Sequence, residues 1–177
     1  MSRRIPVLVA VISATVLANT GCVSIAAPDK QSDAATCVSE FHLGDTEGPL
    51  GSMFKFSDRA IDAAAAGTST TFRELTRSVG WRDDWDRVVD VPQDITAAEL
   101  DRRAGTAGVC WKSLPRRTGS EYDGPRHGYY LFLNGNQPIQ STPWFDPGQR
   151  PFDFQGRDQI FADTPLVRAG STALRPE

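Results

Sequence analysis

The feature that most constrains the fold is a β-hairpin signal in the second half of the chain. Two segments rich in apolar and aromatic residues, 129–133 and 137–140, flank the pair Asn134-Gly135. Asn-Gly is the preferred pair for a two-residue type I′ turn, whose central residues need positive φ. Pro138 has no N–H to donate, so the second strand is expected to have a free edge there. The chain is therefore expected to build an antiparallel sheet.

Helix signals precede this hairpin. Ser57 can cap a helix over 58–66, which Gly67 would end. The stretches 71–74 and 96–99 each have the Thr-x-x-Glu pattern of a capping box. Further strands are expected over 37–41, 52–56, 85–91, 108–112 and 157–162.

Together these elements predict an α+β fold: an antiparallel sheet with two to three short helices packed on one face. We expect one globular domain over 37–163 and a frayed tail over 164–177.

The first 22 residues are typical of an export signal. Arg3 and Arg4 precede an apolar run over 5–18, and small and polar residues follow it. As a helix this run would reach about 21 Å, short of the roughly 30 Å hydrocarbon core of a bilayer. We therefore predict a cleaved signal peptide over 1–21 rather than a retained membrane anchor.

The end of this signal, Thr20-Gly21-Cys22, resembles the lipobox of bacterial lipoproteins. The resemblance implies cleavage before Cys22 and attachment of lipid to its thiol. Asn19 departs from the pattern, which normally has an aliphatic residue there, and the alternative is ordinary cleavage nearby and free secretion. Residues 23–36 are mostly Ala, Ser, Asp, Pro and Lys, so we expect a flexible tether over 22–36.

The cysteine count agrees with export. The chain has three cysteines, and lipidation of Cys22 would leave Cys37 and Cys110 to pair in an oxidising compartment. A disulfide that closes a loop of about 73 residues contributes about 4 kcal/mol in the chain-entropy model. The alternative is a pair of buried free thiols.

The charge balance narrows the choice of partners. Lys and Arg number 19 against 22 Asp and Glu, and without Arg3 and Arg4 the net charge falls from -3 to -5. An acidic chain disfavours nucleic acid as the main ligand. It also disfavours electrostatic adhesion to anionic lipid, so a lipid anchor would have to hold the protein on a membrane.

Catalytic and metal-binding signatures are missing from the sequence. It has no phosphate-binding glycine loop, no Gly-x-Ser-x-Gly, no His-Glu-x-x-His and no Cys-x-x-Cys. The acids of 83–86 lie between Arg82 and Arg87, which favours a salt-bridged edge over a metal site. We therefore predict no catalytic residue, no metal and no cofactor.

Two segments remain as candidate sites. His127 lies near Tyr122, Asp123 and Arg126, so the alternative to a binding protein is a secreted hydrolase that uses His127 with a carboxylate. The other histidine, His42, is expected to lie alone in a loop.

The second segment is the loop over 144–154, where Trp144, Phe145 and Arg150 form the candidate binding surface. Trp and Arg concentrate where proteins bind partners. An inhibitor-like protein acting through this loop is a further alternative. The favoured interpretation, however, is that its rings fold back and complete the core, as we also expect of Trp81, Trp85 and Trp111.

The stretch from Trp85 to the hairpin is also similar in layout to small exported bacterial proteins, a likeness that implies no activity. The sequence as a whole predicts an exported cell-envelope lipoprotein. We expect a non-enzymatic binding or structural module, held on a membrane by its lipid, with an envelope protein as its partner.

Overall fold

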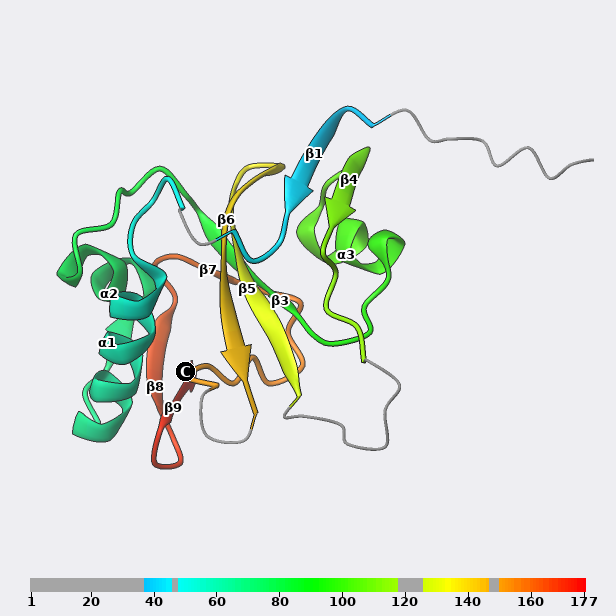
Figure 1. Ribbon diagram of the computed structural model, residues 1–177. Coiled ribbons are helices and arrows are strands. Elements are labelled where there is room, and N and C mark those ends of the chain that lie inside the picture. The colour runs from blue at the N-terminus through cyan, green and yellow to red at the C-terminus, as the bar shows by residue number, and fades with distance from the viewer. Residues whose placement is uncertain (1–36, 46–47, 118–125, 147–149) are drawn as a thin grey trace, which may run out of the picture. The chain divides into compact units, whose positions relative to one another are not determined.

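A four-stranded antiparallel sheet lies at the centre of the computed structural model (Figure 1). Its strands, in spatial order, are β6 (Gln137–Phe145), β5 (His127–Asn134), β3 (Arg87–Val91) and β7 (Gln159–Phe161). The structure describes residues 37–45, 48–117, 126–146 and 150–177, which belong to one compact unit. The predicted signal peptide, Cys22 and the tether lie outside the described residues.

The predicted hairpin is confirmed as β5 and β6, but its turn is displaced by one residue. Asn134 pairs with Gln137, so the two turn residues are Gly135 and Asn136. Only Gly135 has positive φ, at 52°, which fits a type II′ turn better than the predicted type I′. Strand β6 is the outermost strand of its sheet, as Pro138 predicted.

The first face of the central sheet carries two helices and a small sheet. Helices α1 (Met53–Ala66) and α2 (Phe72–Ser78) lie beside the sheet of β2 (Thr70–Thr71), β8 (Pro165–Ala169) and β9 (Ala173–Pro176) (Figure 1). The core between them is rich in aromatic rings, among them Phe56, Phe72, Trp81, Tyr130, Phe132 and Phe152.

The second face carries a smaller and mostly aliphatic layer. Helix α3 (Ala97–Ala104) and the parallel pair β1 (Ser39–His42) and β4 (Val109–Lys112) cover it. Its core includes Val89, Val91, Leu100, Leu131, Leu133 and Trp111.

The α+β class is thus confirmed, with two helices on one face and the third on the other. The reason lies in β3, which is buried along its whole length. Val88 belongs to the first core and Val89 to the second, because successive residues of a strand point to opposite faces. A strand that is apolar on both faces has to be covered on both.

The two threonine caps follow the sequence signals, but the predicted Ser57 cap is wrong, because α1 begins at Met53 after Ser52 and contains Ser57. Thr71 and Glu74 form the complete capping box at the start of α2. Thr96 accepts the backbone N–H of Glu99 at the start of α3, but the Glu99 carboxylate binds arginines of its own helix instead of completing the box.

The strand predicted over 52–56 is wrong, because α1 begins at Met53. Met53, Phe56, Ala60 and Ala63 are buried at helical spacing, which a window of five residues does not distinguish from strand alternation.

The frayed tail predicted over 164–177 is also wrong. Strands β8 and β9 pair with each other in an antiparallel hairpin, and β8 also pairs with β2. Leu166 and Leu174 are fully buried in the first core. The two strands therefore belong to the domain, because their leucines complete the layer against α1.

The predicted disulfide is present between Cys37 and Cys110, with Cα atoms 5.5 Å apart. It joins the chain just before β1 to the partner strand β4. A disulfide of this kind is consistent with an oxidising, exported location. Among the described residues no helix is long and apolar enough to cross a membrane.

Candidate functional site

A groove of about 240 Å³ runs between helix α1 and the outer strand β6. Its lining is mostly apolar and comes from these two elements alone: Met53, Phe54, Ser57, Asp58, Ile61, Thr142, Pro143 and Phe145. We call it the α1–β6 groove.

Two aromatic side chains of this groove are exposed to solvent. Phe54 is 70% exposed and Phe145 43% exposed. Phe54 follows Met53 on the helix and points away from the buried stripe that Met53 and Phe56 begin. Phe145 is the last residue of the outer strand β6 and follows the buried Trp144. Exposed aromatics that share one groove are typical of interaction sites.

One residue of the groove lining, Thr142, has a buried polar group without a partner among the described residues. Thr142 is 1% exposed, and its hydroxyl makes no hydrogen bond to the described part of the chain. A buried polar group left unpaired costs about 1–3 kcal/mol.

The charge of the groove and the prolines of its edge strand limit which partners can bind there. Among the described residues that line the groove, Asp58 is the only charged one. Strand β6 carries Pro138 and Pro143, and each proline removes a backbone donor from the edge. Side-chain contact is therefore favoured over the addition of a further strand.

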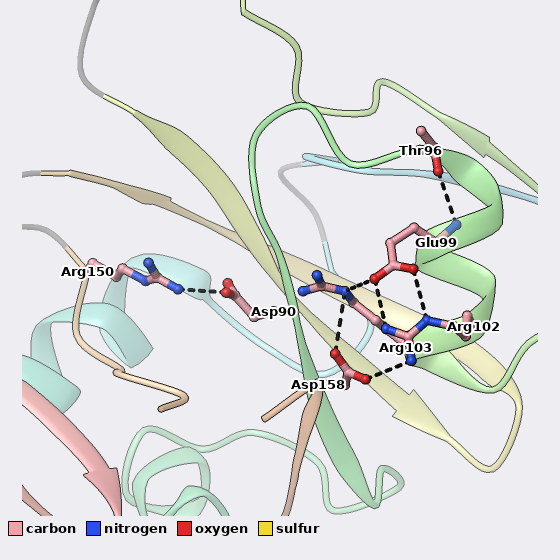
Figure 2. A network of polar contacts seen from close by, with 7 residues as sticks. All are labelled: Asp90, Thr96, Glu99, Arg102, Arg103, Arg150 and Asp158. Atoms are coloured by element: carbon pink, nitrogen blue, oxygen red, sulfur yellow. Dashed lines mark hydrogen bonds and ion pairs between the residues drawn. The ribbon is translucent and has the colours of Figure 1, made fainter. Parts of the chain in front are cut away.

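The predicted surface of Trp144, Phe145 and Arg150 is not exposed as one patch. Trp144 is only 3% exposed, and the Arg150 guanidinium carbon lies 4.4 Å from its ring centroid. Arg150 Nη2 also donates to Asp90 Oδ2 at 2.6 Å (Figure 2). Of the three predicted residues, Phe145 alone contributes to the α1–β6 groove.

The other rings of this segment belong to the core, as the favoured interpretation predicts. Phe152 and Phe154 are buried in the first core, and Tyr130 donates its hydroxyl to the Phe152 carbonyl. Trp81, Trp85 and Trp111 are buried too, as predicted. Sequence reasoning missed Phe54, because the stretch that contains it resembled a strand.

Asp90, the partner of Arg150, is a buried carboxylate next to the predicted surface of Trp144, Phe145 and Arg150. Burial raises its pKa, although Arg150 and the indole N–H of Trp144 act to lower it. That indole lies close to the carboxylate but does not reach it with ordinary hydrogen-bond geometry, and Asp90 Oδ1 has no partner among the described residues.

The histidines do not form a catalytic arrangement in the described structure. His127 begins β5, lies opposite Phe145 in the ladder and is half-buried. Tyr122 and Asp123, which the hydrolase hypothesis places next to His127, lie outside the described residues.

His42 has an acidic partner that the sequence did not indicate. Its Nε2 lies 2.9 Å from Glu40 Oε1, and both side chains are half exposed. Hydrogen bonds from His42 and Lys112 lower the pKa of Glu40, which therefore stays ionised. This pair lines a separate hollow of about 210 Å³ between β1, the loop after it and β6, and it is an ordinary surface hydrogen bond.

The remaining charged clusters hold elements together. Glu99, Arg102, Arg103 and Asp158 form an ion-pair network that joins α3 to the segment before β7 (Figure 2). The acids of 83–86 bind arginines, with Arg77–Asp83 at 2.7 Å and Arg82–Asp84 at 2.6 Å, so the salt-bridged edge is confirmed.

Known proteins offer no guide to this site. No family model matches the chain, no curated protein matches its sequence, and no solved structure matches its fold. The α1–β6 groove therefore has to be interpreted from its own chemistry.

Proposed function

We propose that this protein is an exported cell-envelope lipoprotein and a non-enzymatic binding module, whose α1–β6 groove takes an apolar side chain of an envelope protein. The observation that carries the proposal is the groove itself. Phe54 and Phe145 are exposed along it.

The free energy gained by burying the exposed aromatic side chains favours the binding of a partner in the groove. Covering an exposed aromatic side chain removes apolar surface from water, at about 25 cal/mol for each Å². Hot spots of protein interfaces are typically aromatic anchors in such desolvated pockets. Phe54 is free to act as an anchor because the helix directs it away from the core.

The lining also favours one class of partner. With Asp58 as the one charge among its described lining residues, the groove suits an apolar side chain that has a lysine or arginine next to it. An anionic lipid surface would meet both Asp58 and a net charge of -3 for the whole chain. We therefore infer a protein segment rather than a membrane as the occupant.

Location is the second part of the proposal. The Cys37–Cys110 disulfide supports export, and the lipobox-like ending at Cys22 favours a lipid anchor. A tether over 22–36 would then hold the domain away from the membrane.

Photo-crosslinking in cells that export the full chain tests the groove. A photoreactive amino acid in place of Phe54 should give one discrete adduct with an envelope protein. The same amino acid in place of Phe161 is the matched control, since Phe161 is 57% exposed on the opposite edge strand β7. Adducts of the same pattern from both positions, or none from position 54, would contradict the proposal.

Charge reversal makes the crosslinking test specific. Asp58→Lys should abolish the adduct, because the groove would then repel the basic side chain of its partner. Asp62→Lys, one helical turn further along α1 and outside the groove lining, should leave the adduct in place. An adduct that survives Asp58→Lys would exclude a basic partner segment.

The lipid anchor is tested separately. Intact-mass measurement of the exported chain should show a diacylglyceryl-sized increment that Cys22→Ser removes. Equal masses would exclude the anchor and leave the groove unaffected.

A further inference from the structure

The helix that lines the α1–β6 groove also carries a side chain of the kind that the groove accepts. Four large apolar side chains are exposed among the described residues: Val38, Phe54, Phe145 and Phe161. Of these four, only Phe54 has a basic residue next to it in the sequence, Lys55. The groove suits an apolar side chain with such a neighbour, because its lining includes Asp58. We infer that the partner in the groove is a second copy of this chain, an inference that rests on the proposed function.

The two copies would exchange the same contacts across a two-fold axis. Phe54 of each copy enters the groove of the other, and Lys55 of each copy meets Asp58 of the other. Such an interface is isologous, as in the C2 dimers that are the commonest soluble oligomers. Lys55 and Asp58 are three positions apart on one helix, so the two α1 helices would run in opposite directions and cross near Ser57.

Both charges of this pair are available to a second copy. Lys55 and Asp58 are exposed, and the described part of the chain gives neither side chain an ion pair or a hydrogen bond. Glu99 and Arg102, which have the same spacing, do form an ion pair at 2.8 Å within α3. In Lys55 and Asp58 the base precedes the acid, which is the less favourable order for pairing within one helix.

The charges on the outer face of α1 allow two copies to approach each other. The exposed charged side chains of this helix are two of each sign: Lys55, Asp58, Arg59 and Asp62. The face therefore has no net charge, although the whole chain has a net charge of -3. Repulsion between two such faces is correspondingly small.

The groove has room for a single aromatic ring. Its volume of about 240 Å³ is below the range of about 300–1,000 Å³ that pockets for drug-sized ligands occupy. The ring of Phe54 from the second copy would pack against Phe54, Ile61 and Phe145 of the first. Contacts between aromatic rings stabilise an interface beyond the area that they bury.

Photo-crosslinking between two tagged copies tests the inference. Cells export two full-length copies with different C-terminal epitope tags, and one copy carries a photoreactive amino acid in place of Phe54. We expect an adduct of twice the mass of the chain that contains both tags. If position 54 gives an adduct only with another protein, this inference is overturned and the proposed function stands. If position 54 gives no adduct at all, both are overturned.

A charge swap within the chain separates a second copy from any other partner. Lys55→Asp in both copies should lower the yield of the two-tag adduct about tenfold, because two carboxylates would then face each other. A different protein with a basic segment does not need Lys55, so its adduct would survive this change. The double variant Lys55→Asp with Asp58→Lys should restore the yield, since each copy then offers the reversed pair. A loss that the double variant does not restore would contradict the inference.

Arg157→Asp is the matched control for the change of charge. Arg157 is exposed and lies outside the groove lining, so its substitution should leave the yield of the two-tag adduct unchanged. Equal losses from Lys55→Asp and Arg157→Asp would show that net charge sets the yield, and the inference would then be wrong. The substituted side chains are all exposed, and substitutions at such positions change the stability of a fold little.

Discussion

The two faces of the central sheet are stabilised in different ways. On the first face, the ring of Phe56 contacts four other aromatic rings, with centroids between 5.0 and 6.4 Å apart: Phe72, Trp81, Phe132 and Phe152. The second face has a smaller core, to which the Cys37–Cys110 disulfide and the Glu99 network are added. The disulfide is therefore the link that only the second layer has among the described residues, and the two faces should respond to different perturbations.

The largest expected effect is the loss of a ring on the first face. Phe56→Ala removes the centre of the aromatic cluster and should lower the free energy of unfolding by about 3–5 kcal/mol, since the cavity is large and the site is fully buried. Urea unfolding followed by tryptophan fluorescence measures it.

Phe54→Ala is the matched control, two residues away on the same helix and 70% exposed. It should change the free energy of unfolding by less than about 0.5 kcal/mol. Equal losses for the two variants would show that the aromatic cluster is not what stabilises this face.

The disulfide should come next. Replacing both Cys37 and Cys110 by alanine should lower the free energy of unfolding by about 2–4 kcal/mol, because the reduced chain gains conformational freedom when unfolded. Hydrogen exchange should accelerate in β1, β4 and α3 and stay nearly constant in α1 and β8. Uniform acceleration over both faces would contradict a separate role for the second layer.

The smallest effects are pH effects, and they have opposite signs on the two faces. Bonds from Arg102 and Arg103 lower the pKa of Glu99 from 4.5 to about 2. The stabilisation from Glu99 is therefore fully present above pH 4.5 and is lost as the pH falls towards 2. Burial raises the pKa of Asp90, so folding is favoured as the pH falls through the folded-state pKa of Asp90 towards its unfolded value of 3.8.

Thermal unfolding between pH 7 and pH 2 distinguishes these two carboxylates. The difference in Tm between the wild type and Glu99→Gln should shrink as the pH falls from 4.5 to about 2. The difference in Tm between the wild type and Asp90→Asn should change with pH in the opposite direction. The Glu99 effect should also weaken at about 1 M salt, because its ion pairs are exposed. If Tm depends on pH in the same way in the wild type and in both variants, the assigned pKa shifts are wrong.

Local signals explain what the sequence could predict. The hairpin, the Thr71 cap and the strand at 108–112 each depend on residues within a few positions of one another. The disulfide followed from counting cysteines. Where two periodicities agree over a short window, as at 52–56, the sequence alone does not decide between helix and strand.

The candidate sites were harder to predict because tertiary packing creates them. Phe54 and Phe145 are 91 positions apart in the numbering and share a groove only because α1 lies against β6. Leu166 and Leu174 are core residues because β8 pairs with β2, which is far away in the sequence. Trp144 and Phe145 are neighbours in sequence, but strand alternation buries one and exposes the other.

The position of the disulfide has a mechanical consequence. Cys37 lies two residues before the start of β1, and its sulfur is bonded to Cys110 inside β4. Tension on the preceding chain would pass through the covalent bridge into β4 rather than unzip β1 from its end. A domain pulled from this terminus would transmit force into its interior, with the ladder between β1 and β4 shielded from the load.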